Sequence, residues 1–199
     1  GKGDLELTGG DCFMVIPSEG PNPDYPHLEG RKLLKFPVLT MNTGDGVVEV
    51  LADRSAVEAK DWKAYQTFVT ASGDRVSQPS SQVDFYFAGD GHNHWHFRDF
   101  DDYWIETLDG QVQARAEKHG YCVYDNTSYT PFIGKPGVPD TEVYPYDTTC
   151  GQGLPNALTI IQGLSKGWGD TYPATLPDQA LDITGIPDGR YRVGVHADA

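Results

Sequence analysis

Three histidines alternate along the stretch 90–97 (DGHNHWHF), and their type and spacing suit them to hold a metal ion. In an extended strand alternate side chains face the same side, so His92, His94 and His96 would present three imidazoles together. The outer two α-carbons of an ideal strand would lie ~13 Å apart, near the limit for reaching one ion through bonds of ~2.0 Å. The backbone must therefore bend, and the glycines at positions 89 and 91 make a bend easy.

Three neutral imidazoles suit copper, zinc, nickel or iron, and an open position for water or substrate would make such a site catalytic. Half of the six histidines in the chain lie within five positions, so a chance grouping is improbable. The other three, His27, His119 and His196, are interpreted as solvated or packing side chains. His119 is also a weak candidate for a contact with one of the metal-binding histidines.

The formal net charge of -14 argues against binding nucleic acid, because that task needs Lys and Arg to displace counterions from phosphates. A surface this acidic can instead concentrate cations such as amines and metal ions. No apolar run approaches the ~20 residues that span a bilayer, and the N-terminal residues lack a hydrophobic signal core. We therefore expect no membrane span, and a processed form from which a signal segment is absent.

Three cysteines allow one disulfide and one free thiol. We predict a bridge between Cys122 and Cys150, because it would close a loop rich in Pro, Tyr and Asp, which gains most from a covalent link. Cys12 is left over. A disulfide implies an oxidising compartment, so we expect a secreted or extracellular protein.

Tyr, Phe, Trp, Val, Thr and Gly are plentiful and long helical periods are scarce, so the composition favours strands. We predict one domain over residues 1–199, mainly β, with a sandwich-like core, long irregular loops and at most one or two short helices. One helix is predicted over 55–69, where apolar residues recur at helical spacing after a serine. Asn42 to Gly46 is predicted to be a hairpin or a sandwich corner. Strands are predicted within 5–16, 31–39, 46–51, 83–87, 100–108, 111–116, 180–185 and 190–196, and loops over 17–30 and 124–149.

Other motifs give weaker signals. Asp99, Asp101 and Asp102 have a spacing that calcium loops use, but no Gly and Glu follow to complete an EF-hand, so a solvated acidic turn is the better interpretation. The sequence has no Gly-x-Ser-x-Gly elbow, Walker loop, dinucleotide fingerprint or His-Glu-x-x-His motif.

Over most of its length the chain resembles the catalytic domain of the lysyl oxidase family, in a shorter bacterial or archaeal style. The first anchor is the histidine motif followed by an aromatic-rich strand that contains Tyr103. The second is 118–125 (KHGYCVYD), where a lysine stands four residues before a cysteine. The third is 162–172 (QGLSKGWGDTY) followed by 181–191 (LDITGIPDGRY), which is very similar to the family's C-terminal region.

The resemblance implies a chemistry that composition and spacing do not. In that family a lysine and a tyrosine at these places combine into lysine tyrosylquinone, so the resemblance assigns the cofactor to Lys118 and Tyr172 and copper to the three histidines. It implies a copper-dependent amine oxidase that converts primary amines or peptidyl lysine to aldehydes with O2, releasing hydrogen peroxide and ammonia. Asp170, two residues before Tyr172, is the candidate for the base or for orienting the cofactor.

Two alternatives remain open at this point. The three histidines could hold copper or zinc in a non-catalytic extracellular module, in which Tyr172 stays an ordinary phenol. They could also activate water in a zinc hydrolase, with Glu106 or Asp99 as the base.

Overall fold

The computed structural model describes residues 14–16, 30–69, 72–80, 83–88, 92–98, 100–116, 120–176 and 180–197. Strands account for 43% of the structure and helical turns for 4%, which confirms the mainly β, sandwich-like class. Within the described ranges the helical turns are η2 (Thr130–Phe132) and η3 (Tyr146–Thr148). Neither has the length or the apolarity that crossing a bilayer would require.

The chain divides into two compact units. The first unit comprises Gly1–Val38, Asp99–His119 and Tyr172–Ala199, and the second comprises Leu39–Arg98 and Gly120–Thr171. The single domain expected over residues 1–199 stays a prediction.

The first unit contains two antiparallel three-stranded sheets, β1-β2-β14 and β10-β9-β15. Residues of β9 alternate between buried and partly exposed, as expected for a strand with one covered face. On the covered face Phe36 meets Tyr103 edge to face, with ring centroids 5.7 Å apart. The strands predicted within 100–108, 111–116, 180–185 and 190–196 are confirmed. The strands of this unit are β1 (Met14–Ile16), β2 (Leu33–Lys35), β9 (Asp101–Thr107), β10 (Val112–Arg115), β14 (Leu181–Asp182) and β15 (Tyr191–Ala197).

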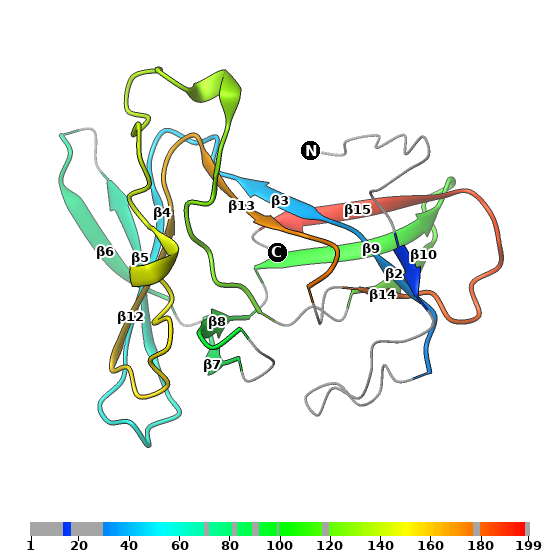
Figure 1. The fold of residues 1–199 in the computed structure, drawn as a ribbon, viewed down its shortest axis with the longest axis horizontal. Helices are drawn as coiled ribbons and strands as arrows, with labels where there is room; N and C mark the ends of the chain where they lie inside the picture. The colour runs from blue at the N-terminus through cyan, green and yellow to red at the C-terminus, as the bar shows by residue number, and fades with distance from the viewer. Residues whose placement is uncertain are drawn as a thin grey trace. The chain divides into compact units, whose positions relative to one another are not determined.

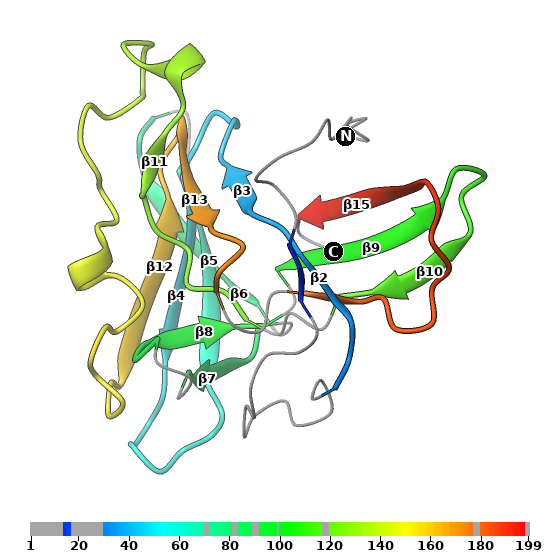
Figure 2. The ribbon, with the colours of Figure 1, turned by 45° about the vertical axis from the view of Figure 1, so that its right-hand side comes forward.

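The second unit contains a four-stranded sheet, β12-β4-β5-β6, a three-stranded sheet, β11-β13-β3, and the hairpin β7-β8 (Figures 1 and 2). The four-stranded sheet is antiparallel throughout. The first residue of β3 and the last residue of β13 belong to the first unit. The strands are β3 (Val38–Met41), β4 (Val48–Asp53), β5 (Lys63–Val69), β6 (Arg75–Ser80), β7 (Phe85–Phe87), β8 (Trp95–Phe97), β11 (Thr127–Ser128), β12 (Thr159–Leu164) and β13 (Trp168–Tyr172).

The helix predicted over 55–69 is wrong. Its second half forms β5, an inner strand that pairs with β4 on one side and β6 on the other. Ala64 and Thr67 are buried in this strand, whereas Phe68 is 44% exposed. The apolar stretch is too short to distinguish the helical period of 3.6 residues from the strand period of 2. Aromatic and β-branched side chains, which pair well across neighbouring strands, favour the strand.

Asn42 to Gly46 joins strands of different sheets, so it is the predicted sandwich corner rather than a hairpin. The buried Asn42 side chain organises it. Its amide nitrogen donates to the carbonyls of Gly46 and Leu164, both at 2.9 Å, and its oxygen accepts from the backbone N–H of Gly44 at 3.1 Å. Such side-chain bonds replace the backbone pairing that a turn cannot supply.

The acidic residues after the histidine motif do not form the predicted solvated turn. Asp101 is buried on β9, where its carboxylate accepts a hydrogen bond from the Tyr103 hydroxyl at 3.1 Å. Asp102 pairs with Arg115 on the neighbouring strand. The prediction is wrong for these two residues because the strand starts earlier than the acidic composition suggests; Asp99 lies outside the described residues.

The predicted long loop 124–149 is confirmed, and it is anchored at both ends. Asp125 is fully buried and accepts hydrogen bonds from the backbone of Val143 and Tyr144 and from the backbone and hydroxyl of Ser165. The predicted disulfide between Cys122 and Cys150 is present. The bridge is compatible with an extracellular protein. Cys12, His27 and the predicted strand and loop over 5–13 and 17–29 lie outside the described residues.

Candidate metal centre

The β7-β8 hairpin carries the histidine motif. Its register pairs Tyr86 with His96, while His92 and His94 lie in the segment that leads into β8. Between them Asn93 has φ of 54°, in the left-handed region that Asn tolerates better than most residues. The expected bend is therefore confirmed, and within the described residues it lies at Asn93; the glycines at 89 and 91 are outside them.

The bend brings one ring nitrogen of each histidine into a single cluster. His92 Nδ1 lies 3.3 Å from His96 Nε2, His94 Nε2 lies 2.8 Å from His96 Nε2, and the three ligand atoms are within 4.8 Å of one another. Two ligands at bonds of ~2.0 Å are separated by about 2.8 Å at a right angle and about 3.3 Å at a tetrahedral angle. The three predicted histidines could therefore bind one metal ion.

The remaining ring nitrogens of two ligands meet polar side chains. His94 Nδ1 lies 2.8 Å from the amide oxygen of Gln152, and His96 Nδ1 lies 3.1 Å from the Tyr86 hydroxyl. Metal-binding histidines usually make such a bond through the nitrogen that does not face the ion, because it fixes the tautomer and the ring orientation. Both contacts leave Nε2 to face the cluster.

Strand β8 pairs with β7 on one edge and is held by hydrogen bonds to other segments on the opposite edge. The Trp95 N–H donates to the Cys150 carbonyl at 2.8 Å, and the Trp95 carbonyl accepts from the Gln162 side chain at 2.9 Å. Phe97 and Tyr121 exchange backbone hydrogen bonds of 2.9 and 2.8 Å. With its backbone satisfied by partners from other segments, the strand gives His96 a fixed base.

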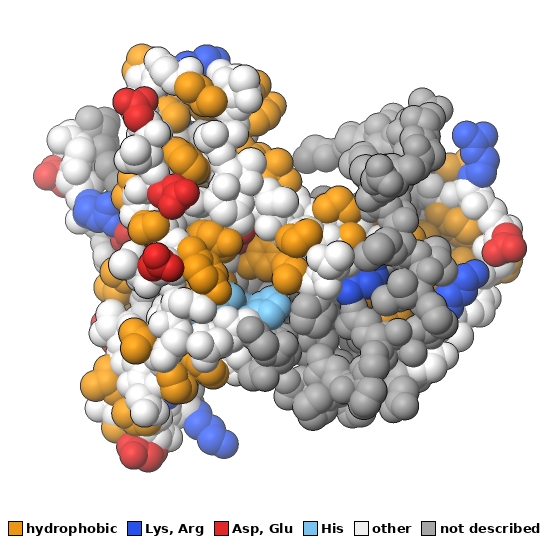
Figure 3. Space-filling view, in the orientation of Figure 1, with side chains coloured by type: hydrophobic (Ala, Val, Ile, Leu, Met, Phe, Trp, Pro, Cys, Tyr) orange, Lys and Arg blue, Asp and Glu red, His pale blue; other side chains and the backbone are white. Residues whose placement is uncertain are grey.

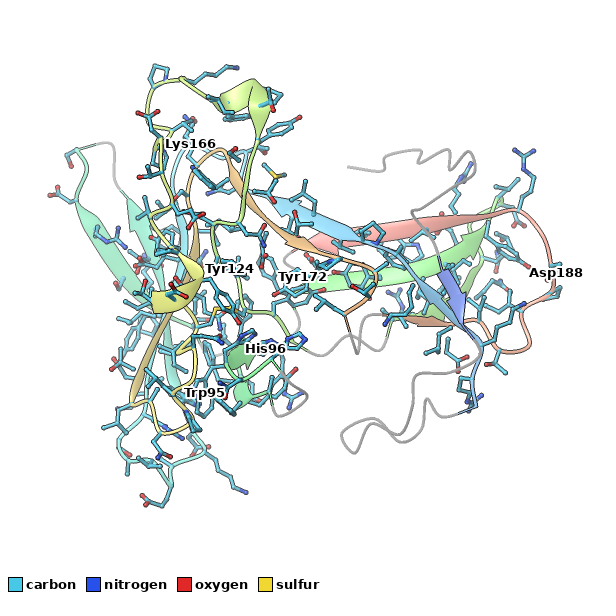
Figure 4. The ribbon with its side chains drawn as sticks, in the orientation of Figure 1. Trp95, His96, Tyr124, Lys166, Tyr172 and Asp188 are labelled. Carbon is cyan, nitrogen blue, oxygen red and sulfur yellow. A yellow bond between two sulfur atoms is a disulfide. The ribbon has the colours of Figure 1, made fainter. Side chains whose placement is uncertain are left out.

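One side of the cluster is covered and one side is accessible. His94 and His96 are 6% and 3% exposed, whereas His92 is half-buried. Histidine atoms reach the face shown in Figure 3 beside hydrophobic side chains. Trp95, next to His96 on β8 (Figure 4), packs against Trp62 with ring centroids 4.8 Å apart.

Two tyrosines extend from the cluster along the long loop. The ring of Tyr146 meets that of His94 edge to face at 5.9 Å, and Tyr124 lies 5.2 Å from Tyr146. Burial raises the pKa of the Tyr124 phenol, and the negative charge of Asp170 raises it further. A hydrogen bond with Asn126 acts in the opposite direction. The net effect is a raised pKa for the Tyr124 phenol.

Asp170 lies in β13 and not in a turn, and it is 2% exposed. Its carboxylate accepts a hydrogen bond from the Asn126 side chain. Tyr172, two residues further on, is the last residue of β13 and is buried, and it belongs to the first unit.

Within the described residues, no contact joins several of the predicted site residues to the histidine cluster. Lys118 and His119 lie outside the described residues. Glu106 lies on β9 in the first unit and accepts a hydrogen bond from the Trp104 indole at 2.9 Å. His196 is exposed on β15, as expected for a solvated side chain. The roles assigned to Lys118, Tyr172 and Asp170 stay predictions.

Sequence reasoning missed Tyr86, Gln152, Tyr124 and Tyr146. Tyr86 could have been found by pairing the predicted strand 83–87 with the histidine strand in a hairpin, which sets it opposite His96. Gln152 stands 58 positions from His94, and no spacing rule relates them. Only the adjacent disulfide marked its segment as structurally important.

Comparison with known proteins adds no family to this picture. The chain matches no protein-family model and no curated protein sequence. The functional argument therefore depends on the residues of this chain and on their geometry.

Replacing Gly120 with alanine is expected to disturb the metal centre. A Cβ at this position would overlap the Tyr86 hydroxyl and would lie 2.7 Å from His96 Cβ, so Tyr86, His96 or the backbone at position 120 must shift. We expect a loss of about 1–3 kcal/mol in the free energy of unfolding and weaker metal binding. Urea unfolding and a metal titration measure the two effects. Gly46→Ala is the control, because nothing lies within 4 Å of its added Cβ; equal behaviour of the two variants would contradict the prediction.

Proposed function

We propose that the chain is a copper-dependent amine oxidase, similar to lysyl oxidases, with a lysine tyrosylquinone built from Lys118 and Tyr172. The overall reaction converts a primary amine, O2 and water into an aldehyde, ammonia and hydrogen peroxide. The substrate is a primary amine or a peptidyl lysine. The protein is secreted or extracellular.

The observation that carries the proposal concerns the sequence neighbours of the two cofactor residues. Gly120, two residues after Lys118, packs against Tyr86 and His96. Asp170, two residues before Tyr172, accepts a hydrogen bond from Asn126. Tyr124, two residues before Asn126, meets the ring of Tyr146, which meets that of His94. Gly120 contacts the histidine cluster and Asp170 lies in the same unit as the cluster, which supports the proposal.

The residues of the chain have distinct tasks in this proposal. His94 and His96 hold copper through Nε2 and His92 through Nδ1, the atoms that face one another. Bound copper supplies a one-electron redox centre for O2 and for a phenol, and the quinone supplies a carbonyl electrophile for the amine. Asp170 accepts the proton from the carbon beside the amine. A carboxylate suits that step because it is already shielded from water and oriented by Asn126.

The surroundings of the site suit a cationic substrate. Tyr146 is 37% exposed and its ring lies near His94, where the aromatic quadrupole would attract an ammonium group. The net charge of -14 raises the local concentration of amines around the protein.

Phenylhydrazine labelling tests the proposal. We expect the copper-loaded protein, kept under air, to form a visible absorbing adduct, and peptide mass spectrometry to find it on a peptide that joins Lys118 to Tyr172. Tyr172→Phe removes the phenol that becomes the quinone, so this variant should bind copper and form no adduct.

Two other results would each point to a rival function. Full copper occupancy with no adduct and separate, unmodified Lys118 and Tyr172 peptides would leave a metal-binding module. Hydrolysis that a chelator abolishes, with no consumption of O2, would indicate a zinc hydrolase with Glu106 or Asp99 as the base.

A further inference from the structure

The segment 150–153, directly after the second disulfide cysteine, has an unusual backbone. Cys150, Gly151 and Gly153 have φ of 60°, 61° and 69°, all in the left-handed region. Only Gly adopts this region without cost, so a cysteine there must be held by its surroundings. Cys150 is held by its disulfide to Cys122 and by a hydrogen bond from its N–H to the Ile161 carbonyl at 2.8 Å.

The same segment is fastened to the histidine motif through the backbone. The Cys150 carbonyl accepts from the Trp95 N–H at 2.8 Å, and the Gly153 N–H donates to the Asn93 carbonyl at 2.8 Å. A Cβ on Gly151 would lie 2.9 Å from Trp95 Cδ1, so the close approach needs glycine there. These contacts lie on both sides of Gln152 and do not involve its side chain.

The fastened segment presents the Gln152 side chain to one metal ligand. Its amide oxygen lies 2.8 Å from His94 Nδ1, on the far side of the ring from the nitrogen that faces His96. An amide oxygen can only accept a hydrogen bond, so it selects the tautomer of His94 that carries its proton on Nδ1. In that tautomer Nε2 keeps its lone pair for an ion.

We infer that Gln152 is a positioning residue for the metal centre, which fixes the tautomer and the ring orientation of His94. Without Gln152 the His94 ring can rotate and can carry its proton on either nitrogen. Part of the free energy of metal binding is then spent on restoring the binding geometry, so the affinity falls. Loss of a group that orients a ligand typically costs 10–100-fold in metal affinity. The inference depends on the metal-binding part of the proposed function and not on the quinone.

Two substitutions of Gln152 separate positioning from a structural role. Gln152→Leu keeps a side chain of similar size and removes the acceptor, so we expect Cu²⁺ affinity to fall 10–100-fold and the nitrogen hyperfine pattern in the EPR spectrum to change. Gln152→Glu keeps an acceptor at the same reach, so its affinity should stay at or above that of the unmodified protein. Gln66→Leu, on the exposed face of β5, is the control and should bind like the unmodified protein. Affinity is measured by competition with a chelator of known strength.

The outcomes are distinguishable. Urea unfolding of metal-free Gln152→Leu should give a midpoint close to that of the control, because the segment is held by its backbone and the disulfide. Unchanged affinity and an unchanged EPR spectrum in Gln152→Leu would overturn the inference. A loss of affinity in Gln152→Glu as large as that in Gln152→Leu would also overturn it. Failure of the unmodified protein to bind Cu²⁺ would overturn both the inference and the proposed function. If Gln152→Leu weakened copper binding but the unmodified protein formed no phenylhydrazine adduct, the inference would stand and only the proposed amine oxidase activity would be overturned.

Discussion

Replacing His96 with alanine is expected to weaken Cu²⁺ or Zn²⁺ binding by at least about a hundredfold. His96 Nε2 is the atom closest to the ligand atoms of both other histidines, and its ring is buried and in contact with Tyr86. Structural zinc sites in zinc-finger peptides contribute ~10–16 kcal/mol, so one of four ligands there accounts for about 3 kcal/mol, which is at least a hundredfold in affinity, and we expect a similar loss here. Competition titration with a chelator measures the loss.

Thermal unfolding gives an independent measurement of the same loss. An ion that binds only the folded chain stabilises it in proportion to the logarithm of its concentration over its dissociation constant. Metal should raise the melting temperature of the unmodified protein and of His196→Ala, whose histidine is exposed on β15. It should raise that of His96→Ala far less. An equal shift in His96→Ala would mean that the ion binds elsewhere on the chain.

The metal ligands were predictable because their chemistry lies within five consecutive positions. Alternation along a strand predicted that the imidazoles share a side, and bond lengths predicted that the backbone must bend. Asn93 provides that bend with φ of 54°. The disulfide was predictable for a related reason, since a loop rich in Pro, Tyr and Asp gains from closure.

The residues behind the ligands were not predictable in the same way. Gln152 and Tyr146 reach His94 from a loop more than 50 positions away, and their place depends on the hydrogen bonds of Asp125 and on the Cys122–Cys150 bridge. Such contacts are set by tertiary packing, which leaves no periodic trace in the sequence. The error over 55–69 has the same origin, because β5 forms by pairing with strands on both sides.

The bridge connects the stability of the fold to the metal centre. Cys150 is bonded to Cys122 through sulfur, to β12 through its N–H and to β8 through its carbonyl. β8 carries His96, and the residues that follow Cys150 carry Gln152 to His94. Loss of the bridge should therefore affect unfolding and metal binding together.

Replacing Cys122 and Cys150 with alanine is expected to lower the free energy of unfolding by about 3.5 kcal/mol, the chain-entropy value for a loop of this size. The two cysteines are 28 positions apart. We expect Cu²⁺ affinity to fall as well, by up to the 10–100-fold expected for Gln152→Leu. Without the bridge, residue 150 would no longer be held in its left-handed conformation, and Gln152 would be less well positioned against His94. Cys12→Ser, which leaves the bridge intact, is the matched control for both measurements. If the double variant lost stability in urea and yet bound Cu²⁺ as tightly as that control, the bridge would stabilise the loop without positioning His94, and the backbone hydrogen bonds from Trp95 and Gly153 would be enough to hold Gln152 in place.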